Sequence, residues 1–234
     1  MKSTWFIALF LLLAACKKED PILTTVQTTG FHSVEINSFF NVYLQEDTVF
    51  YVELIGAEEF VNAVKIEVSD SVLVMHNDAK NNWTHPTDKQ VKIIVHAPPL
   101  KLVTVNETAS VNTINPITSQ EFGLVMKSKS NEANLELECA TFYYWNNFPT
   151  GGSLTLRGHA HNLKLWNTAI LTVNARELIA QYALVENDAK ADCIVTVTQK
   201  IEYGLTNQGN IHVYGAPVYF EEIEHTGTGA LIVH

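Results

Sequence analysis

The chain has 234 residues, of which 17% are charged, and its formal net charge at pH 7 is −10. It has only two arginines, Arg157 and Arg176, and no basic cluster, which argues against binding of nucleic acid or of other polyanions. The length fits one domain, or one elongated repeat domain, since repeat folds exceed the usual domain length without splitting.

An apolar run follows Lys2 and extends over residues 5–15. It is too short for an ordinary membrane-spanning helix and has the form of a secretory signal, so residues 1–15 are predicted to be a signal peptide. The sequence Leu13-Ala14-Ala15-Cys16 then resembles a bacterial lipobox, in which the cysteine is lipidated and becomes the mature N-terminus. We therefore expect attachment to the membrane through lipid on Cys16 rather than a membrane span.

Residues 16–30 form a predicted lipidated tether, charged at first and then rich in threonine. Its start, Lys17-Lys18-Glu19-Asp20, resembles the lysine-then-acid tract that directs bacterial lipoproteins to the cell surface. Such charges are also ordinary solvated linker, so surface display and a periplasmic location both stay open. The predicted localisation is an outer-membrane lipoprotein.

Residues 31–99 form a predicted N-terminal β section that packs on the rest of the fold or continues it. Short stretches rich in β-branched and aromatic residues predict strands at 33–37, 39–45, 49–54, 65–68, 72–76 and 91–96. Good helix formers with one apolar face predict a helix of two turns at most within residues 56–64. Residues 77–89 are polar and predict a surface loop.

From residue 100 to residue 234 the sequence repeats with a period near twenty. Apolar residues recur in columns on one parity, namely Tyr143, Leu163, Ala183 and Tyr203, then Trp145, Leu165, Val185 and Leu205, and lower columns such as Leu171, Ile211 and Leu231. Alternate strand side chains face opposite sides, so these columns are predicted to point inward. The pattern predicts an all-β fold, a single-stranded right-handed β-helix, or β-solenoid, with rungs of about twenty residues.

Four asparagines follow the same period: Asn147, Asn167, Asn187 and Asn207. An asparagine tolerates the left-handed backbone region, and stacked amides can bond from rung to rung, so we expect a structural ladder at one corner. Cys139 and Cys193 are separated by nearly three periods of the repeat, which places them too far apart for a disulfide.

The opposite parity predicts an exposed aromatic patch. If Tyr143 and Trp145 point inward, the side chains that point outward on this rung and the next two include Phe142, Tyr144, Trp166 and Tyr182. Such a patch would stack sugar rings and bond their hydroxyls. Two alternatives stay open: the patch is a protein interface, or the N-terminal section covers it.

Catalytic and metal-binding groups are sparse. Arg157 and Arg176 could lie on adjacent rungs near acidic residues, but isolated solvated charges are the simpler interpretation. Cys139, His159 and His161 could approach one another, yet surface histidines without a ligand are the better hypothesis. We predict no catalytic residue, no metal and no cofactor.

Several segments resemble the head GIN domain family of putative auto-transporter adhesins, and the resemblance covers almost all of the mature chain. They are Phe31-His32-Ser33-Val34-Glu35-Ile36, Phe40-Asn41-Val42-Tyr43-Leu44-Gln45, Ala97-Pro98-Pro99-Leu100, Gly151-Gly152-Ser153-Leu154-Thr155-Leu156-Arg157-Gly158 and Gln208-Gly209-Asn210-Ile211-His212-Val213-Tyr214-Gly215-Ala216-Pro217. The family tends to place a Gly-x-Gly-like corner before each short strand, and here Gly227-Thr228-Gly229 keeps it cleanly. The resemblance implies a β-helical fold at the cell envelope.

These observations predict a non-enzymatic, lipid-anchored envelope protein that presents a rigid solenoid surface for adhesion, or for binding an envelope or host component. The alternative is a carbohydrate-binding or carbohydrate-active protein that uses the aromatic patch. Its partners would be the membrane, through the N-terminal lipid, and a glycan or protein ligand. Because an open strand edge invites pairing, the last rung, ending at Val233 and His234, also predicts weak self-association.

Overall fold

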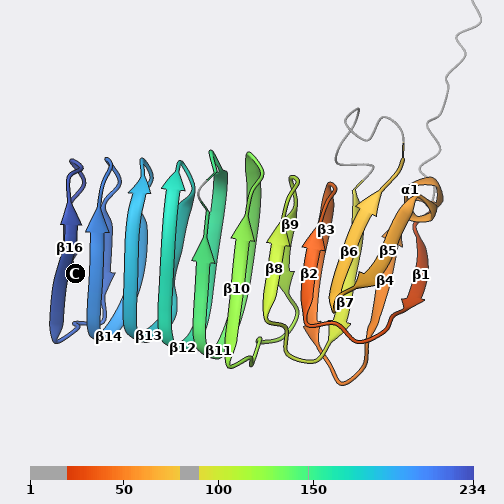
Figure 1. The fold of residues 1–234 in the computed structure, drawn as a ribbon, viewed down its shortest axis with the longest axis horizontal. Coiled ribbons are helices and arrows are strands. Elements are labelled where there is room, and N and C mark those ends of the chain that lie inside the picture. Colours follow the sequence, from red (N-terminus) through yellow and green to blue (C-terminus); the bar gives the residue numbers. More distant parts are fainter. Residues whose placement is uncertain (1–19, 80–89, 147) are drawn as a thin grey trace, which may run out of the picture.

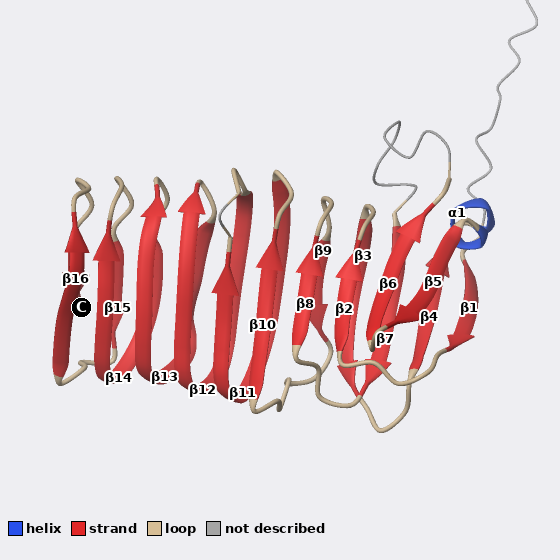
Figure 2. Cartoon of the chain, in the orientation of Figure 1, coloured by secondary structure: helices blue, strands red, loops and turns tan. Residues whose placement is uncertain are grey.

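The protein is an elongated two-walled β-solenoid (Figure 1). The structure, a computed structural model, describes residues 20–79, 90–146 and 148–234. Figure 2 shows that nearly all of this described part is strand or tight turn, with one short helix at the N-terminal end. Cys16 and the predicted signal peptide lie outside the described residues.

Each rung contributes one strand to each of two walls, which pack face to face around one buried core. The first wall contains, in spatial order, β6 (Val72–Asn77), β2 (Ser33–Ile36), β8 (Leu102–Val105), β10 (Glu121–Met126), the C-terminal parts of β11 (Ser130–Trp145), β12 (Gly151–Ala169), β13 (Thr172–Ala189) and β14 (Cys193–Leu205), and β16 (Tyr219–His225). The second wall contains β7 (Val91–Ala97), β3 (Phe40–Glu46), β9 (Ser110–Thr113), the N-terminal parts of β11 to β14, β15 (Ile211–Tyr214) and β17 (Leu231–Val233).

The rungs stack in parallel with lengths near the predicted period. Thr141 pairs with Asn162, Asn162 with Tyr182, Tyr182 with Lys200, and Lys200 with Tyr219. The first of these spacings is slightly longer than the predicted period, the second equals it, and the last two are slightly shorter. The predicted β-solenoid with rungs of about twenty residues is confirmed.

Alternating side chains fill the space between the walls. On the first wall Leu163, Leu165 and Val185 are fully buried, and on the second wall Leu156 and Val173 are too. Each such side chain stabilises the fold by roughly 1.5–3 kcal/mol relative to exposure. The chain bends between the walls within β11 and β12, at Ala140 and His161, where the pairing passes from Cys139↔Ala160 to Thr141↔Asn162.

At the other edge of the rungs, asparagine side chains stabilise the turns. Asn167 lies opposite Asn187 and is fully buried, and its Nδ2 donates to Asn187 Oδ1 at 3.2 Å and to the Leu171 carbonyl at 2.9 Å. In the preceding rung Asn146 occupies this level, and its Oδ1 accepts a 2.8 Å bond from the Thr168 amide.

The ladder therefore differs from the prediction at both ends. Asn147 lies outside the described residues, and the buried asparagine of its turn is Asn146. Asn207 does not align with Asn187, because this rung is shorter than the predicted period and Asn187 pairs with Leu205 instead. The Asn207 Nδ2 donates to the Asp188 carbonyl at 3.3 Å.

The N-terminal section continues the solenoid, but in a spatial order that differs from chain order. β2 and β3 are inserted between the rung of β6 and β7 and the rung of β8 and β9, and pair in parallel with both. Antiparallel strands then close this end: β5 (Val64–Ser69) on β6, β4 (Tyr51–Gly56) on β7, and β1 (Ile22–Gln27) on β4. Helix α1 (Glu58–Asn62) buries Phe60 and Val61 here.

One part of the predicted tether is therefore folded. Ile22 and Val26 pack against the core from β1, so the prediction of a tether through residue 30 is wrong for residues 22–27. Along β1, partly buried side chains alternate with exposed ones, and several of them are β-branched, as is typical of an edge strand.

The opposite end exposes the large apolar side chains of the last described rung. Val218, Tyr219, Phe220, Ile223 and Val233 are 44–66% exposed. The predicted self-association through this rung stays a prediction, which sedimentation over a range of concentrations would measure.

Cys139 and Cys193 are both buried and unbridged, and burial raises the pKa of each thiol to about 12. Because the thiolate is the reactive form, neither thiol is expected to react with a disulfide reagent at pH 8 while the protein is folded. Both should react once guanidinium unfolds it. Fast labelling of either thiol under native conditions would contradict the buried placement.

Candidate functional site

The candidate site lies on the outer surface of the first wall, where strand register brings aromatic side chains together. Val125 of β10 pairs with Trp145 of β11, and Trp145 pairs with Trp166 of β12. Two positions along the same strands, Gly123 pairs with Tyr143. Residues two apart face the same side, so Tyr143 and Trp145 project outward together.

These residues form an open apolar hollow of 460 Å³, lined by Val125, Tyr143, Trp145 and Trp166, which we call the aromatic hollow. The Trp145 side chain is 36% exposed and contacts Phe148 edge to face, with ring centroids 6.1 Å apart. The Trp166 Nε1 donates a 3.0 Å hydrogen bond to Glu186 Oε1 on the next rung, which fixes the indole ring. The hollow is thus a preformed surface of oriented rings.

Gly123 allows the outer end of the Tyr143 ring to lie over the neighbouring strand. A Cβ atom at Gly123 would overlap Tyr143 Cζ, so any other residue there would displace the ring. Burial raises the pKa of the Tyr143 hydroxyl, and the nearby Glu121 carboxylate raises it further. The hydroxyl is therefore protonated at neutral pH and can donate.

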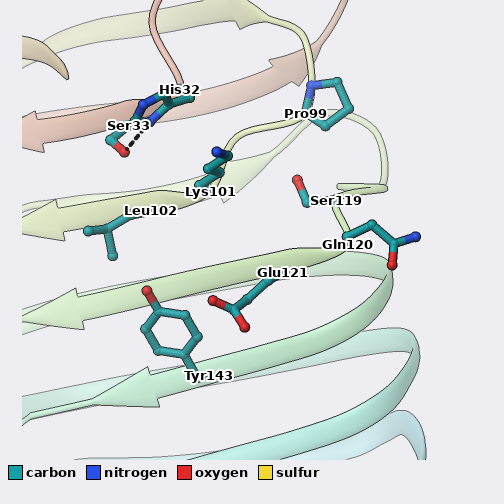
Figure 3. Close-up of a pocket in the computed structure, with 9 residues that line it drawn as sticks. All are labelled: His32, Ser33, Pro99, Lys101, Leu102, Ser119, Gln120, Glu121 and Tyr143. Atoms are coloured by element: carbon teal, nitrogen blue, oxygen red, sulfur yellow. Dashed lines mark hydrogen bonds between the residues drawn. The ribbon is translucent and has the colours of Figure 1, made fainter. Parts of the chain in front are cut away.

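Tyr143 also lines a second hollow, of 610 Å³ (Figure 3). We call this the polar pocket; it is lined by His32, Ser33, Pro99, Lys101, Leu102, Ser119, Gln120, Glu121 and Tyr143. Ser33, Leu102 and Glu121 are the first residues of β2, β8 and β10, and His32, Lys101 and Gln120 immediately precede them. The two hollows are neighbours because they share the Tyr143 ring.

The two charged groups of this pocket form no ion pair with any residue that the structure describes. Neither the Lys101 amine nor the Glu121 carboxylate is paired, whereas Lys200 on the same wall pairs with Glu202 and Glu221 at 2.7 Å. The His32 Nδ1 contacts Ser33 Oγ at 2.9 Å, and Ser119 Oγ donates to the Leu100 carbonyl. The pocket thus combines one cation and one anion outside ion pairs with neutral hydrogen-bonding groups.

The predicted aromatic patch is wrong for two of its four residues. Phe142 and Tyr144 are fully buried in the core, while Trp166 faces outward and Tyr182 is 42% exposed. Tyr182 lies on β13, in a smaller hollow with Lys164 and Glu202. The site therefore has Tyr143 and Trp145 where Phe142 and Tyr144 were expected.

The physical reason is one extra residue in a single rung. Trp145 pairs with Trp166, and Trp166 pairs with Glu186, so the first of these rungs is longer than the second by one position. A one-residue shift moves every side chain of a strand to its other face. If the repeat is aligned with Asn146, instead of Asn147, level with Asn167, then Tyr143 and Trp145 take positions on the outward face of the strand.

The other sequence candidates form surface pairs. The Arg157 Nε contacts Glu136 Oε2 at 3.2 Å, and His159 Nδ1 contacts Glu138 Oε1 at 2.8 Å. Arg157 pairs with Glu177, so Arg176 lies on the rung adjacent to Arg157, and its guanidinium lies over the Tyr214 ring. Within the described residues there is no cluster of three or more metal-ligating side chains.

The fold and the site together define a β-solenoid with a preformed, outward-facing aromatic surface. The chain belongs to the family described as putative auto-transporter adhesin, head GIN domain, which matches residues 30–217. The family resemblance predicted from the sequence is therefore confirmed. No match was found among curated proteins.

Solved structures share the fold at low sequence identity. A putative adhesin from Bacteroides fragilis has a TM-score of 0.76 at 17% identity, over 92% of this chain and 98% of that one. A putative lipid binding protein from Parabacteroides distasonis has a TM-score of 0.64 at 13% identity, over 92% and 97%. A putative adhesin from Parabacteroides merdae has a TM-score of 0.60 at 13% identity, over 91% and 96%. In the described part of this chain, no helix has the length and apolar character needed to cross a membrane.

Proposed function

We propose that this protein is a lipid-anchored binding protein of the bacterial envelope that captures an envelope or host component on its first wall. The observation that carries this proposal is the aromatic hollow, where Tyr143, Trp145 and Trp166 converge on the outer surface. Exposed aromatic rings that adjacent rungs hold in place are typical of binding surfaces, because they offer a large contact area at low entropic cost. Membership of an adhesin-type family supports the same conclusion.

The site favours binding over catalysis. Glycoside hydrolysis uses two carboxylates that flank the scissile bond. Among the described residues that line the two hollows, Glu121 alone carries a carboxylate, and the neighbouring Glu186 carboxylate accepts the hydrogen bond from Trp166 Nε1. Carbohydrate recognition without hydrolysis is the second candidate function, and the row of aromatic rings favours it.

The binding test compares variants of a soluble form that begins at Asp20. Trp145→Ala combined with Trp166→Ala is expected to reduce binding to envelope fractions and mucin-coated surfaces at least tenfold, with little change in thermal stability. The matched control is Tyr43→Ala, which removes a partly exposed ring on the second wall, outside both hollows. An unchanged affinity in the double variant would remove the hollow from the binding site.

The anchor is tested in the full chain. Cys16→Ala is expected to release the protein from the membrane fraction or to block its processing, because the lipid would be its only attachment. Fractionation followed by immunoblotting measures this. Retention of a processed variant in the membrane would contradict the proposed anchor, and protease added to intact cells separates surface display from a periplasmic location.

A further inference from the structure

We infer that the ligand is a chain of neutral sugars, with one ring stacked in the aromatic hollow and an adjoining unit bound in the polar pocket. This inference rests on the proposed function and names the ligand class for the same wall. It depends on three features: the continuity of the two hollows, the geometry of the rings, and the balance of charges in the pocket.

The two hollows form one continuous binding surface. Tyr143 lines both of them, and the outer end of its ring lies over Gly123. The surface spans β12, β11, β10, β8 and β2, and neighbouring strands lie about 4.8 Å apart. It is therefore longer than one sugar ring and suits an extended chain that runs across the strands.

The aromatic hollow suits the apolar face of a sugar ring. Its lining is almost entirely carbon, and Glu186 holds the Trp166 indole nitrogen at the rim. The C–H bonds on one face of a pyranose pack on aromatic rings, while its hydroxyl groups stay at the edges, where polar side chains can reach them. Lys164 is exposed beside Tyr143 at this edge.

The polar pocket suits neutral hydroxyl groups better than a charged group. A hydroxyl both donates and accepts, so two neighbouring hydroxyls can donate to Glu121 and accept from Lys101 at the same time. An acidic sugar would be attracted by Lys101 but repelled by Glu121 and by the net charge of −10, and an amine would be repelled by Lys101. The Gln120 amide, the His32 ring and the Tyr143 hydroxyl add neutral donors and acceptors.

The experiment measures binding of defined probes to the soluble form by calorimetry and tryptophan fluorescence. The probes are neutral hexaoses of mannose, glucose and galactose units, oligogalacturonate as an acidic counterpart, and vesicles of phosphatidylethanolamine and phosphatidylglycerol. We expect at least one neutral hexaose to bind, with an affinity that changes less than twofold between low and physiological salt. We expect neither oligogalacturonate nor vesicles to bind.

Variants then separate the two hollows. Lys101→Met and Glu121→Gln, which keep side-chain size, should each weaken binding of the hexaose about tenfold, and Tyr143→Phe should weaken it less. Matched controls are Lys190→Met and Glu177→Gln, which change exposed charges outside both hollows. If the Lys101 and Glu121 variants bind the hexaose as tightly as the unchanged protein does, the assignment of the polar pocket is overturned.

The inference and the proposed function fail in different ways. If no neutral hexaose binds, while the Trp145 and Trp166 double variant still loses binding to envelope fractions, the ligand class is wrong and the binding surface stands. Binding of vesicles that depends on the two tryptophans would indicate a lipid ligand and overturn the sugar assignment. If the double variant binds every probe and fraction normally, both are wrong.

Discussion

Replacing Tyr144 by alanine is expected to lower the free energy of unfolding by about 3–5 kcal/mol, as for other large aromatic side chains removed from a core. Tyr144 has no exposed surface and is among the largest fully buried side chains of the described chain. Its removal leaves a cavity that the rigid stack of rungs on either side cannot close. Denaturation of the soluble form by guanidinium measures this loss.

Two companion variants make the test specific. The Tyr144 hydroxyl is buried without a hydrogen-bond partner among the described residues, so Tyr144→Phe should keep or raise stability. Tyr143→Ala, one residue away but outside the core, should cost about 1 kcal/mol or less. Equal losses from the two alanine variants would contradict the assignment of Tyr144 to the core and Tyr143 to the surface.

The period of the chain was predictable because each rung of a solenoid buries apolar side chains at equivalent positions, so these side chains recur at a fixed spacing in the sequence. From β12 to β13 the spacing equals the predicted period, so Leu163 pairs with Ala183 and Leu165 with Val185 in the core as expected. From β11 to β12 the spacing is longer by one position. The sequence does not show this change, because both the even-numbered and the odd-numbered positions of this stretch carry apolar residues. Phe142, Tyr143, Tyr144 and Trp145 are all aromatic, so alternation of polarity could not show which pair faces inward.

The polar pocket could not be predicted from the sequence. His32, Lys101 and Glu121 are brought together because β2 lies beside β8, although the chain forms β3 to β7 between these two strands. A local pattern carries no information about such an insertion. By contrast, each strand of the N-terminal section is specified by its own short run of residues, and most of these strands begin and end within two residues of their predicted bounds.

Replacing Asn187 by aspartate is expected to destabilise the protein by about 3–5 kcal/mol at pH 7, because the variant buries a charge without a compensating partner. The Asn187 Nδ2 donates to the carbonyls of Ala191 at 3.1 Å and Asn210 at 3.3 Å, while its Oδ1 accepts from Asn167. A carboxylate keeps the bond from Asn167 but turns its other oxygen toward two carbonyl oxygens. These contacts favour the protonated acid, whose hydroxyl can still donate to one carbonyl.

The pH dependence gives the sharper measurement. The folded protein should raise the pKa of the new carboxyl above its unfolded value of about 3.9, so the destabilisation is least below that pH. It should grow as the pH rises toward the folded pKa, by about 1.4 kcal/mol per pH unit, and then level off. Asn207→Asp is the matched control, since Asn207 is only partly buried and lies outside the ladder. It should show a small loss with little pH dependence, and a loss in Asn187→Asp that stays constant between pH 4 and pH 8 would contradict the observed orientation of the amide.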